Sequence, residues 1–213
     1  MTALKVFVSS TSEDLTDYRA AARDVILDAG WQPVMMEHFP TDPSPIVAMC
    51  QRLIADCDLV LLLQAFRRGW VPTPEQRGDG ENSMTAFELK AADNLHKPVR
   101  VFLAKETWPG NLWEEEPSGR AWVKNFRNGL NRSAKFFDVE TTPFKDFRSV
   151  LREALSHHKD GLIGSPAQKD VSDASDEALQ NAVLRPPPAE QEPARHALSA
   201  APAVHAPADV CGP

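Results

Sequence analysis

An unbroken apolar run, Leu59-Val60-Leu61-Leu62-Leu63, lies between two stretches with helical periodicity. It shows no alternation of apolar and polar residues, so we expect both faces of this strand to be covered. Val6-Phe7-Val8 is a second such run, and the segment from Val99 to Leu103 is a third, mostly apolar one. Strands of this kind lie in the middle of parallel sheets that carry helices on both sides. The pattern therefore predicts an α/β protein.

Strands and helices alternate through the rest of this region. The expected strands are 5–9, 32–37, 59–63, 99–103 and 134–137. The first helix is expected to follow Ser10-Thr11-Ser12-Glu13, which has the spacing of a capping box, and to end at Gly30. Further helices are expected from Pro45, over 83–94, over 119–130 and over 144–157. Right-handed βαβ units in this order predict a flavodoxin-like three-layer sandwich with a five-stranded parallel sheet.

The composition changes sharply near the end of the chain. Phe147 is the last aromatic residue, and the residues from Gly164 onward contain eight of the 18 prolines. A segment without aromatic residues and rich in Pro and Ala cannot bury enough apolar surface to offset its conformational entropy. We therefore expect one domain over 1–162 and a disordered Pro/Ala-rich tail or linker over 163–213, a tether to a partner or to a further domain.

The overall composition excludes several classes of function. The formal net charge of −7 argues against a nucleic-acid or anionic-membrane binder, because both need a basic surface. Cys50, Cys57 and Cys211 are too few for a disulfide framework, and no set of residues has metal-ligand spacing. No apolar run approaches the roughly 18 residues of a membrane span, and no signal peptide is visible. We expect a cytoplasmic protein that contacts neither nucleic acid nor membrane and holds no metal.

Glu88 breaks the pattern of its helix. It falls on the same stripe as Met84, Ala91 and Ala92 and is therefore expected to face the core. Burial raises the pKa of a carboxyl group, and chains seldom keep such a group without a partner or a purpose. Glu88 is either a functional carboxylate or half of a structural ion pair, with Arg19 or Arg67 as the partner.

Other candidate residues lie near strand ends, because ligand sites of doubly wound folds form beyond the carboxyl ends of the strands. Ser9, Ser10 and Glu37 follow the first two strands, and Arg67 lies in the loop after the third. Ser10 is alternatively a simple helix cap, and solvation explains Arg67 equally well. Asp58, just before the third strand, either orients a ligand or caps the preceding turn. The chain contains no phosphate-binding Gly-x-x-x-x-Gly-Lys-Ser/Thr loop.

An ordered set of motifs resembles a family known as domain of unknown function 4062 (DUF4062), over about Leu4 to Leu155. The motifs are Val6-Phe7-Val8-Ser9-Ser10-Thr11-Ser12-Glu13-Asp14-Leu15, Tyr18-Arg19, Met36-Glu37, Cys57-Asp58, Arg67-Arg68-Gly69, Ser83-Met84-Thr85-Ala86-Phe87-Glu88 and Lys97-Pro98-Val99-Arg100-Val101-Phe102. The resemblance implies a TIR-like fold. It also implies a signalling context, since such domains stand at the N-terminus of bacterial STAND ATPases and of TPR or WD-repeat proteins, some linked to anti-phage defence.

The segment Thr85-Ala86-Phe87-Glu88-Leu89 is also similar to the nucleophile motif of nucleoside deoxyribosyltransferases. By that resemblance, and by that to TIR-type NAD hydrolases, Glu88 would act on the ribose of NAD or a nucleotide, with no further cofactor. Asp58 would support it, and Ser9 and Ser10 would border the ribose. Two positions depart from the family pattern, namely Arg68, where an aromatic residue is usual, and Gln64-Ala65, where a glycine-containing turn is usual.

Two classes of function follow from these observations. The first is an enzyme that cleaves or transfers at the N-glycosidic bond of NAD or a nucleotide, with Glu88 as its central carboxylate. The second is a module without catalysis that self-associates, docks a signalling partner or senses a nucleotide. An open cleft beside Glu88 favours the enzyme, whereas an ion pair from Glu88 to Arg19 or Arg67 in a closed core favours the module.

Overall fold

The computed structural model describes residues 3–36 and 45–163. Five strands form its sheet: β1 (Lys5–Ser10), β2 (Gln32–Val34), β3 (Leu59–Gln64), β4 (Val99–Ala104) and β5 (Lys135–Phe137). Five α-helices connect them: α1 (Thr16–Asp28), α2 (Ile46–Ala55), α3 (Met84–Asn94), α4 (Pro117–Leu130) and α5 (Lys145–Ile163). The predicted tail from residue 164 onward and Glu37 lie outside the described residues, so the disorder of the tail stays a prediction.

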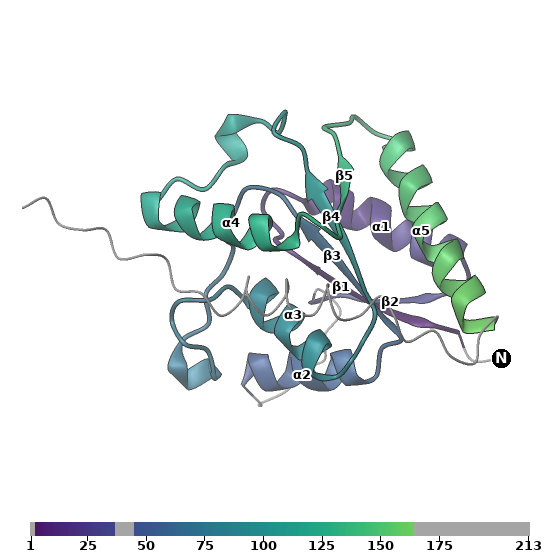
Figure 1. Ribbon diagram of the computed structural model, residues 1–213, viewed down its shortest axis with the longest axis horizontal. Coiled ribbons are helices and arrows are strands. Elements are labelled where there is room, and N and C mark those ends of the chain that lie inside the picture. Colours follow the sequence, from purple (N-terminus) through teal and green to yellow (C-terminus); the bar gives the residue numbers. More distant parts are fainter. Residues whose placement is uncertain (1–2, 37–44, 164–213) are drawn as a thin grey trace, which may run out of the picture.

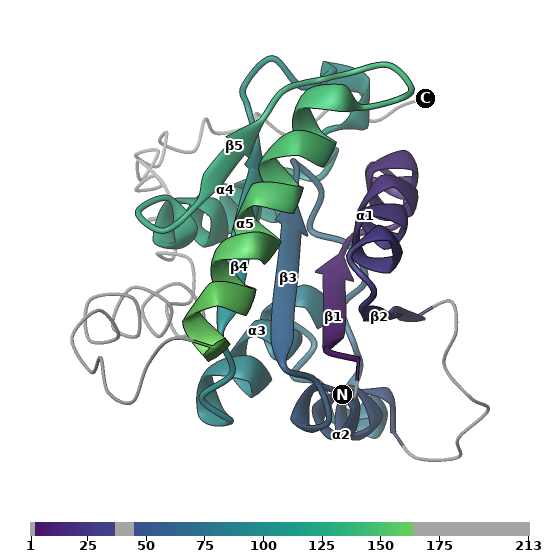
Figure 2. The same cartoon turned by 90° about the vertical axis from the view of Figure 1, so that its right-hand side faces the viewer.

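All strand pairs are parallel, in the order β2-β1-β3-β4-β5. Helices α1 and α5 cover one face of the sheet, and α2, α3 and α4 cover the other (Figures 1 and 2). This strand order is that of flavodoxin-like folds. The prediction of an α/β fold with a five-stranded parallel sheet is confirmed.

The buried strands explain why the two helical layers form. All six residues of β3 are buried, as the unbroken apolar run predicts. Along β1, side chains alternate between faces: Val6 and Val8 pack with α1 and α5, whereas Phe7 packs with α2 and α3. The next two residues of β1, Ser9 and Ser10, therefore point to opposite faces of the sheet.

Several predicted boundaries differ from the structure, among them the end of α5, which lies at Ile163 and not at 157. The capping box at Ser10 is wrong, because Ser10 still belongs to β1 and α1 begins only at Thr16, without a side-chain cap. The chain first turns over residues 12–15, where the hydroxyl of Thr11 donates to Asp14. Strand β2 ends at Val34, earlier than expected, and it pairs only with β1 at the edge of the sheet. Gly30 ends the first helix as predicted, with φ of 76°.

Candidate functional site

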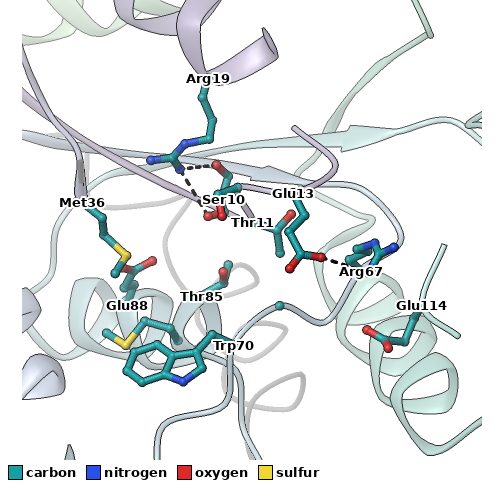
Figure 3. Close-up of a pocket in the computed structure, with 13 residues that line it drawn as sticks. Ser10, Thr11, Glu13, Arg19, Met36, Arg67, Trp70, Thr85, Glu88 and Glu114 are labelled. Atoms are coloured by element: carbon teal, nitrogen blue, oxygen red, sulfur yellow. Dashed lines mark hydrogen bonds and ion pairs between the residues drawn. The ribbon is translucent and has the colours of Figure 1, made fainter. Parts of the chain in front are cut away.

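A cavity of about 630 Å³ opens at the carboxyl edge of the sheet, beyond the ends of β1 and β3. The chain places β2 on one side of β1 and β3 on the other, so the loops that follow β1 and β3 diverge here. The cavity is lined by residues 10–13 after β1, by the loop after β3 and by the first turns of α3 (Figure 3). Arg19, Met36 and Glu114 complete the wall. The site therefore lies where the fold was expected to place it.

Helix α3 brings Glu88 to this cavity. Its N-cap is Ser83, whose Oγ accepts a hydrogen bond from the Ala86 amide at 3.3 Å. Glu88 follows one turn later on the buried face and is only 3% exposed, as the periodicity predicts. In Figure 3 its carboxyl group lies between Met36 and Thr85. The carboxylate thus forms part of the cavity wall while being almost completely withdrawn from solvent.

The two oxygens of Glu88 have different surroundings. Ser9 donates its hydroxyl proton to Oε2 at 2.6 Å. The other oxygen, Oε1, is buried, and no N–H or O–H group of the described residues donates to it. Burial raises the pKa of Glu88 to about 7, while the hydrogen bond from Ser9, the positive charge of Arg19 and the neighbouring Cys50 thiol, a weak donor, oppose that rise. A substantial fraction of this carboxyl group is therefore ionised at neutral pH, with one oxygen still to be satisfied.

Cys50 of α2 lies beside the same carboxyl group. Burial and the neighbouring Glu88 raise the pKa of its thiol well above the usual range. A thiol in this environment stays protonated and behaves as a small apolar group. Cys50 is therefore not a reactive nucleophile, and its thiol, a weak hydrogen-bond donor, lowers the pKa of Glu88.

The pleat of β1 separates the two predicted serines. Ser9 faces α3, is 1% exposed and reaches the cavity only through its hydrogen bond to Glu88. Ser10 faces α1, and its Oγ and carbonyl oxygen accept hydrogen bonds from Nη1 of Arg19 at 2.6 and 3.2 Å. Ser10 lines the cavity, so it is placed to border a ligand. Ser9 instead fixes the orientation of the Glu88 carboxylate.

Neither arginine considered as a partner forms an ion pair with Glu88 in the described part of the chain. Nη1 of Arg67 contacts Oε2 of Glu13 at 3.0 Å and so connects the loops after β3 and β1. Arg19 donates to Ser10 and acts on Glu88 through its charge alone. The structural ion pair that the sequence left open is therefore absent between these residues.

The loop after β3 approaches β1 closely. Gly69 has φ of 76°, and a Cβ atom there would lie 2.6 Å from Cγ2 of Thr11, so only glycine fits without displacement.

Arg68, one of the two departures from the family pattern, points away from the cavity, with its guanidinium 5.3 Å from the ring centre of Trp122 on α4. Trp70 lines the cavity and is 45% exposed. An aromatic surface is thus present, but at Trp70.

The structure does not bring Asp58 to the site. Asp58 precedes β3, and its Oδ2 accepts a hydrogen bond from the Lys5 amide at 2.8 Å. Both residues lie at the amino end of their strands, the opposite edge of the sheet from Glu88. Asp58 is exposed there and links β1 to β3. Glu37 lies outside the described residues.

Several residues of the wall were not predicted. Three of them, Thr11, Ser12 and Thr85, belong to the motifs quoted above, but only the structure shows that they line the cavity. Glu114 comes from the loop after β4, where its amide donates to the Phe66 carbonyl at 2.8 Å and its Oε2 accepts from the Arg68 amide at 2.9 Å. Periodicity predicts the faces of helices and strands but not the position of a loop residue, so the sequence did not indicate that Glu114 lines the cavity.

The described residues, 3–36 and 45–163, contain no group of three or more His, Cys, Asp or Glu side chains able to hold a metal ion. Within the same residues, no helix is both long enough and apolar enough to cross a membrane.

Comparisons with known proteins identify the family but no specific activity. A search of curated proteins finds no match. One family model matches residues 5–159, most of the chain. The chain therefore belongs to the family described as domain of unknown function DUF4062.

Proposed function

We propose that this domain cleaves or transfers at the N-glycosidic bond of NAD, a nucleotide or a related nucleoside, with Glu88 as the central carboxylate. The observation that carries the proposal is the buried Oε1 of Glu88, which lacks an N–H or O–H donor among the described residues, in the wall of a cavity of about 630 Å³. Buried carboxylates usually have all their acceptors satisfied, and an unsatisfied one costs stability. A ligand that contacts Oε1 would supply the missing partner.

The chemistry follows from an ionised carboxylate beside a sugar. The bond from C1′ to the base nitrogen breaks, and its electron pair leaves with the base. Oε1 of Glu88 stabilises the positive charge on C1′ or forms a bond to it. Water then supplies a hydroxyl group to C1′, and its other proton goes to the departing base, or to solvent when the base is the cationic nicotinamide. In a transfer reaction, a nitrogen of a second base takes the place of water.

The surrounding groups suit such a ligand. Trp70 offers an exposed indole face on which a base can stack. Ser10, Ser12 and Thr85 bring hydroxyl groups to the wall for a sugar. Ser9 orients Glu88 from behind. Arg67 supports the site indirectly, by holding the loop that carries Trp70 against Glu13.

The similarity of 85–89 to the nucleophile motif of nucleoside deoxyribosyltransferases, and the TIR-like character implied by the family resemblance, agree with this proposal. Both are analogies from fold and one motif, so the site carries the argument. On the same grounds we propose a cytoplasmic signalling role, with self-association or a signalling partner, in bacterial anti-phage defence.

One observation favours an alternative without turnover. Glu88 is 3% exposed, so a ligand reaches Oε1 only after neighbouring groups such as Met36 move. A nucleotide sensor or an interaction module would use such a group to couple ligand binding to a change in shape. The alternative predicts binding without release of a base.

The test compares the full chain with Glu88→Gln, both concentrated and artificially clustered, for release of free base from NAD, from nucleosides and from their 5′-monophosphates. Gln keeps the shape and an oxygen that accepts from Ser9. We expect base release to fall by about 10²–10⁴-fold. Glu116→Gln, an exposed position at the start of α4, is the charge-matched control and should retain activity. Equal base release by the Glu88→Gln and unmodified chains would contradict the proposal. Ligand binding without release of a base from either chain would support the nucleotide sensor.

A further inference from the structure

The segment between β1 and α1 carries negative charge where flavodoxin-like folds offer a phosphate site. Glu13 lines the cavity, Asp14 is buried beside it, and Asp17 lies in the first turn of α1. Asp14 accepts a hydrogen bond from the Thr11 hydroxyl, and its Oδ2 is buried without a hydrogen-bond partner among the described residues. A phosphate group at this helix end would meet the carboxylates of the chain itself and be repelled.

Both cationic side chains of the described cavity wall donate to the protein, although Nε of Arg67 is buried without a hydrogen-bond partner among the described residues. Arg67 contacts Glu13 at 3.0 Å, and its charge also acts on the buried Asp14. Arg19 donates to the hydroxyl and carbonyl oxygens of Ser10. Glu114 adds a further carboxylate to the wall. A dianionic phosphate would have to displace Glu13 from Arg67, and it would then face Glu13, Asp14 and Glu114 with one guanidinium group shared among them.

The remaining wall suits uncharged groups. Trp70 and Met36 line the cavity with exposed fractions of 45% and 38%, high values for large apolar side chains. Met84 adds a buried thioether next to them. Figure 3 places the indole of Trp70 and the thioether of Met36 on the side of the cavity where Glu88 lies. A flat, uncharged base covers such surfaces without bringing charge toward Glu13 or Glu114.

We propose, resting on the function proposed above, that the cavity takes an unphosphorylated nucleoside and discriminates against the corresponding 5′-phosphate. The discrimination comes from repulsion by Glu13, Asp14 and Glu114, and stacking on Trp70 provides the affinity. The reaction is unchanged: the bond from C1′ to the base nitrogen breaks with assistance from Oε1 of Glu88, and water supplies the hydroxyl group. NAD and nucleotides are then the poorer substrates of the class.

Binding is measured by calorimetry on the full chain carrying Glu88→Gln, so that turnover does not interfere. The probes are adenosine, inosine and uridine, each paired with its 5′-monophosphate, at low ionic strength. We expect the nucleoside of the best-bound pair to bind about 10-fold more tightly than its monophosphate, as repulsion between a dianion and nearby partly solvated carboxylates predicts. Adding Glu13→Gln should narrow that ratio by about 3- to 10-fold, because one repelling charge is removed and Arg67 is released. Adding Glu116→Gln instead makes the same change in net charge outside the cavity and should leave the ratio unchanged.

Several outcomes would overturn this inference: equal or tighter binding of the monophosphates, no binding of any probe, or a ratio that Glu13→Gln does not move. Base release by the unmodified chain, measured in parallel, separates the inference from the function on which it rests. Selective nucleoside binding without any base release would refute the enzyme and retain the nucleoside site. Base release that is faster from the 5′-monophosphates would support the enzyme and refute the selectivity.

Discussion

Two buried charged residues lie on the same face of the sheet near its carboxyl edge, and their surroundings differ. Arg127 of α4 is 8% exposed, and its guanidinium donates to the carbonyl oxygens of Gln64, Ala65 and Ala104 at 3.1, 3.1 and 2.6 Å. Its guanidinium carbon also lies 4.0 Å from the ring centre of Phe66. Glu88 of α3 is buried to a similar extent, yet only one of its two oxygens accepts from an N–H or O–H donor of the described residues.

The difference separates a structural charge from a functional one. Arg127 satisfies carbonyl groups at the ends of β3 and β4 and so holds the start of the loop that forms the cavity wall. Burial lowers the pKa of Arg127, and the nearby negative charge of Glu106 opposes that change. Glu88 leaves an acceptor unsatisfied beside a cavity, which lowers stability and has a purpose only if a ligand supplies the partner.

The largest change in stability is expected for Arg127→Met. It removes the donor of three buried carbonyl groups, and we expect the free energy of unfolding to fall by about 4 kcal/mol, since each unsatisfied buried group costs about 1–3 kcal/mol. Urea denaturation measures the effect. Lys124→Met removes the same charge from an exposed position of α4 and should change stability by less than about 0.5 kcal/mol. Similar losses of stability in both variants would contradict the structural role of Arg127.

The next effect concerns the pH dependence of stability. Glu88 titrates at about 7 in the folded chain, against 4.5 for an unperturbed glutamate. Between these values the folded state keeps a proton that the unfolded state has lost, so this group makes stability fall as pH rises toward 7. The free energy of unfolding of Glu88→Gln, relative to that of the unmodified chain, should therefore increase by on the order of 3 kcal/mol between pH 5 and pH 8. Urea titrations of both chains at the two pH values measure this difference, in which the contributions of Asp14 and other groups cancel. No change in the difference would mean that Glu88 is not desolvated.

A smaller effect is expected for Ser9→Ala, which leaves both oxygens of Glu88 without an N–H or O–H donor among the described residues. Stability should fall by about 1–2 kcal/mol. The pKa of Glu88 should rise further, because the hydrogen bond from Ser9 lowers it. If Glu88 must be ionised for catalysis, the pH profile of base release in Ser9→Ala shifts to higher pH, and activity returns once the pH exceeds the raised pKa of Glu88. Ser9→Thr keeps the hydroxyl group and should restore the original profile. An unchanged pH profile in Ser9→Ala would show that Ser9 does not position Glu88.

The sequence was most informative where periodicity applies. The apolar runs predicted the parallel sheet, and the stripe through Met84 and Ala91 predicted that Glu88 is buried. Asp58 shows how a resemblance can mislead: a residue just before a strand of a parallel sheet lies at the amino edge, away from a site at the carboxyl edge. Position along the chain already contained that information.

Side-chain direction and loop contacts lay beyond sequence reasoning. The different roles of Ser9 and Ser10 follow from the pleat and from where the strand ends, and the turn at 12–15 moved the helix start away from Ser10. Glu114 reaches the cavity through hydrogen bonds to Phe66 and Arg68, which connect segments 46–48 residues apart. Contacts between distant loops form only once the whole sheet is assembled.

The most direct test of the central claim measures base release and the free energy of unfolding on the same preparation of Glu88→Gln at pH 8. A functional carboxylate that costs stability predicts that base release is lost by about 10²–10⁴-fold while the variant is as stable as the unmodified chain or more stable. Retained base release, or a loss that merely accompanies a less stable chain, would contradict the account and make Glu88 a structural residue like Arg127.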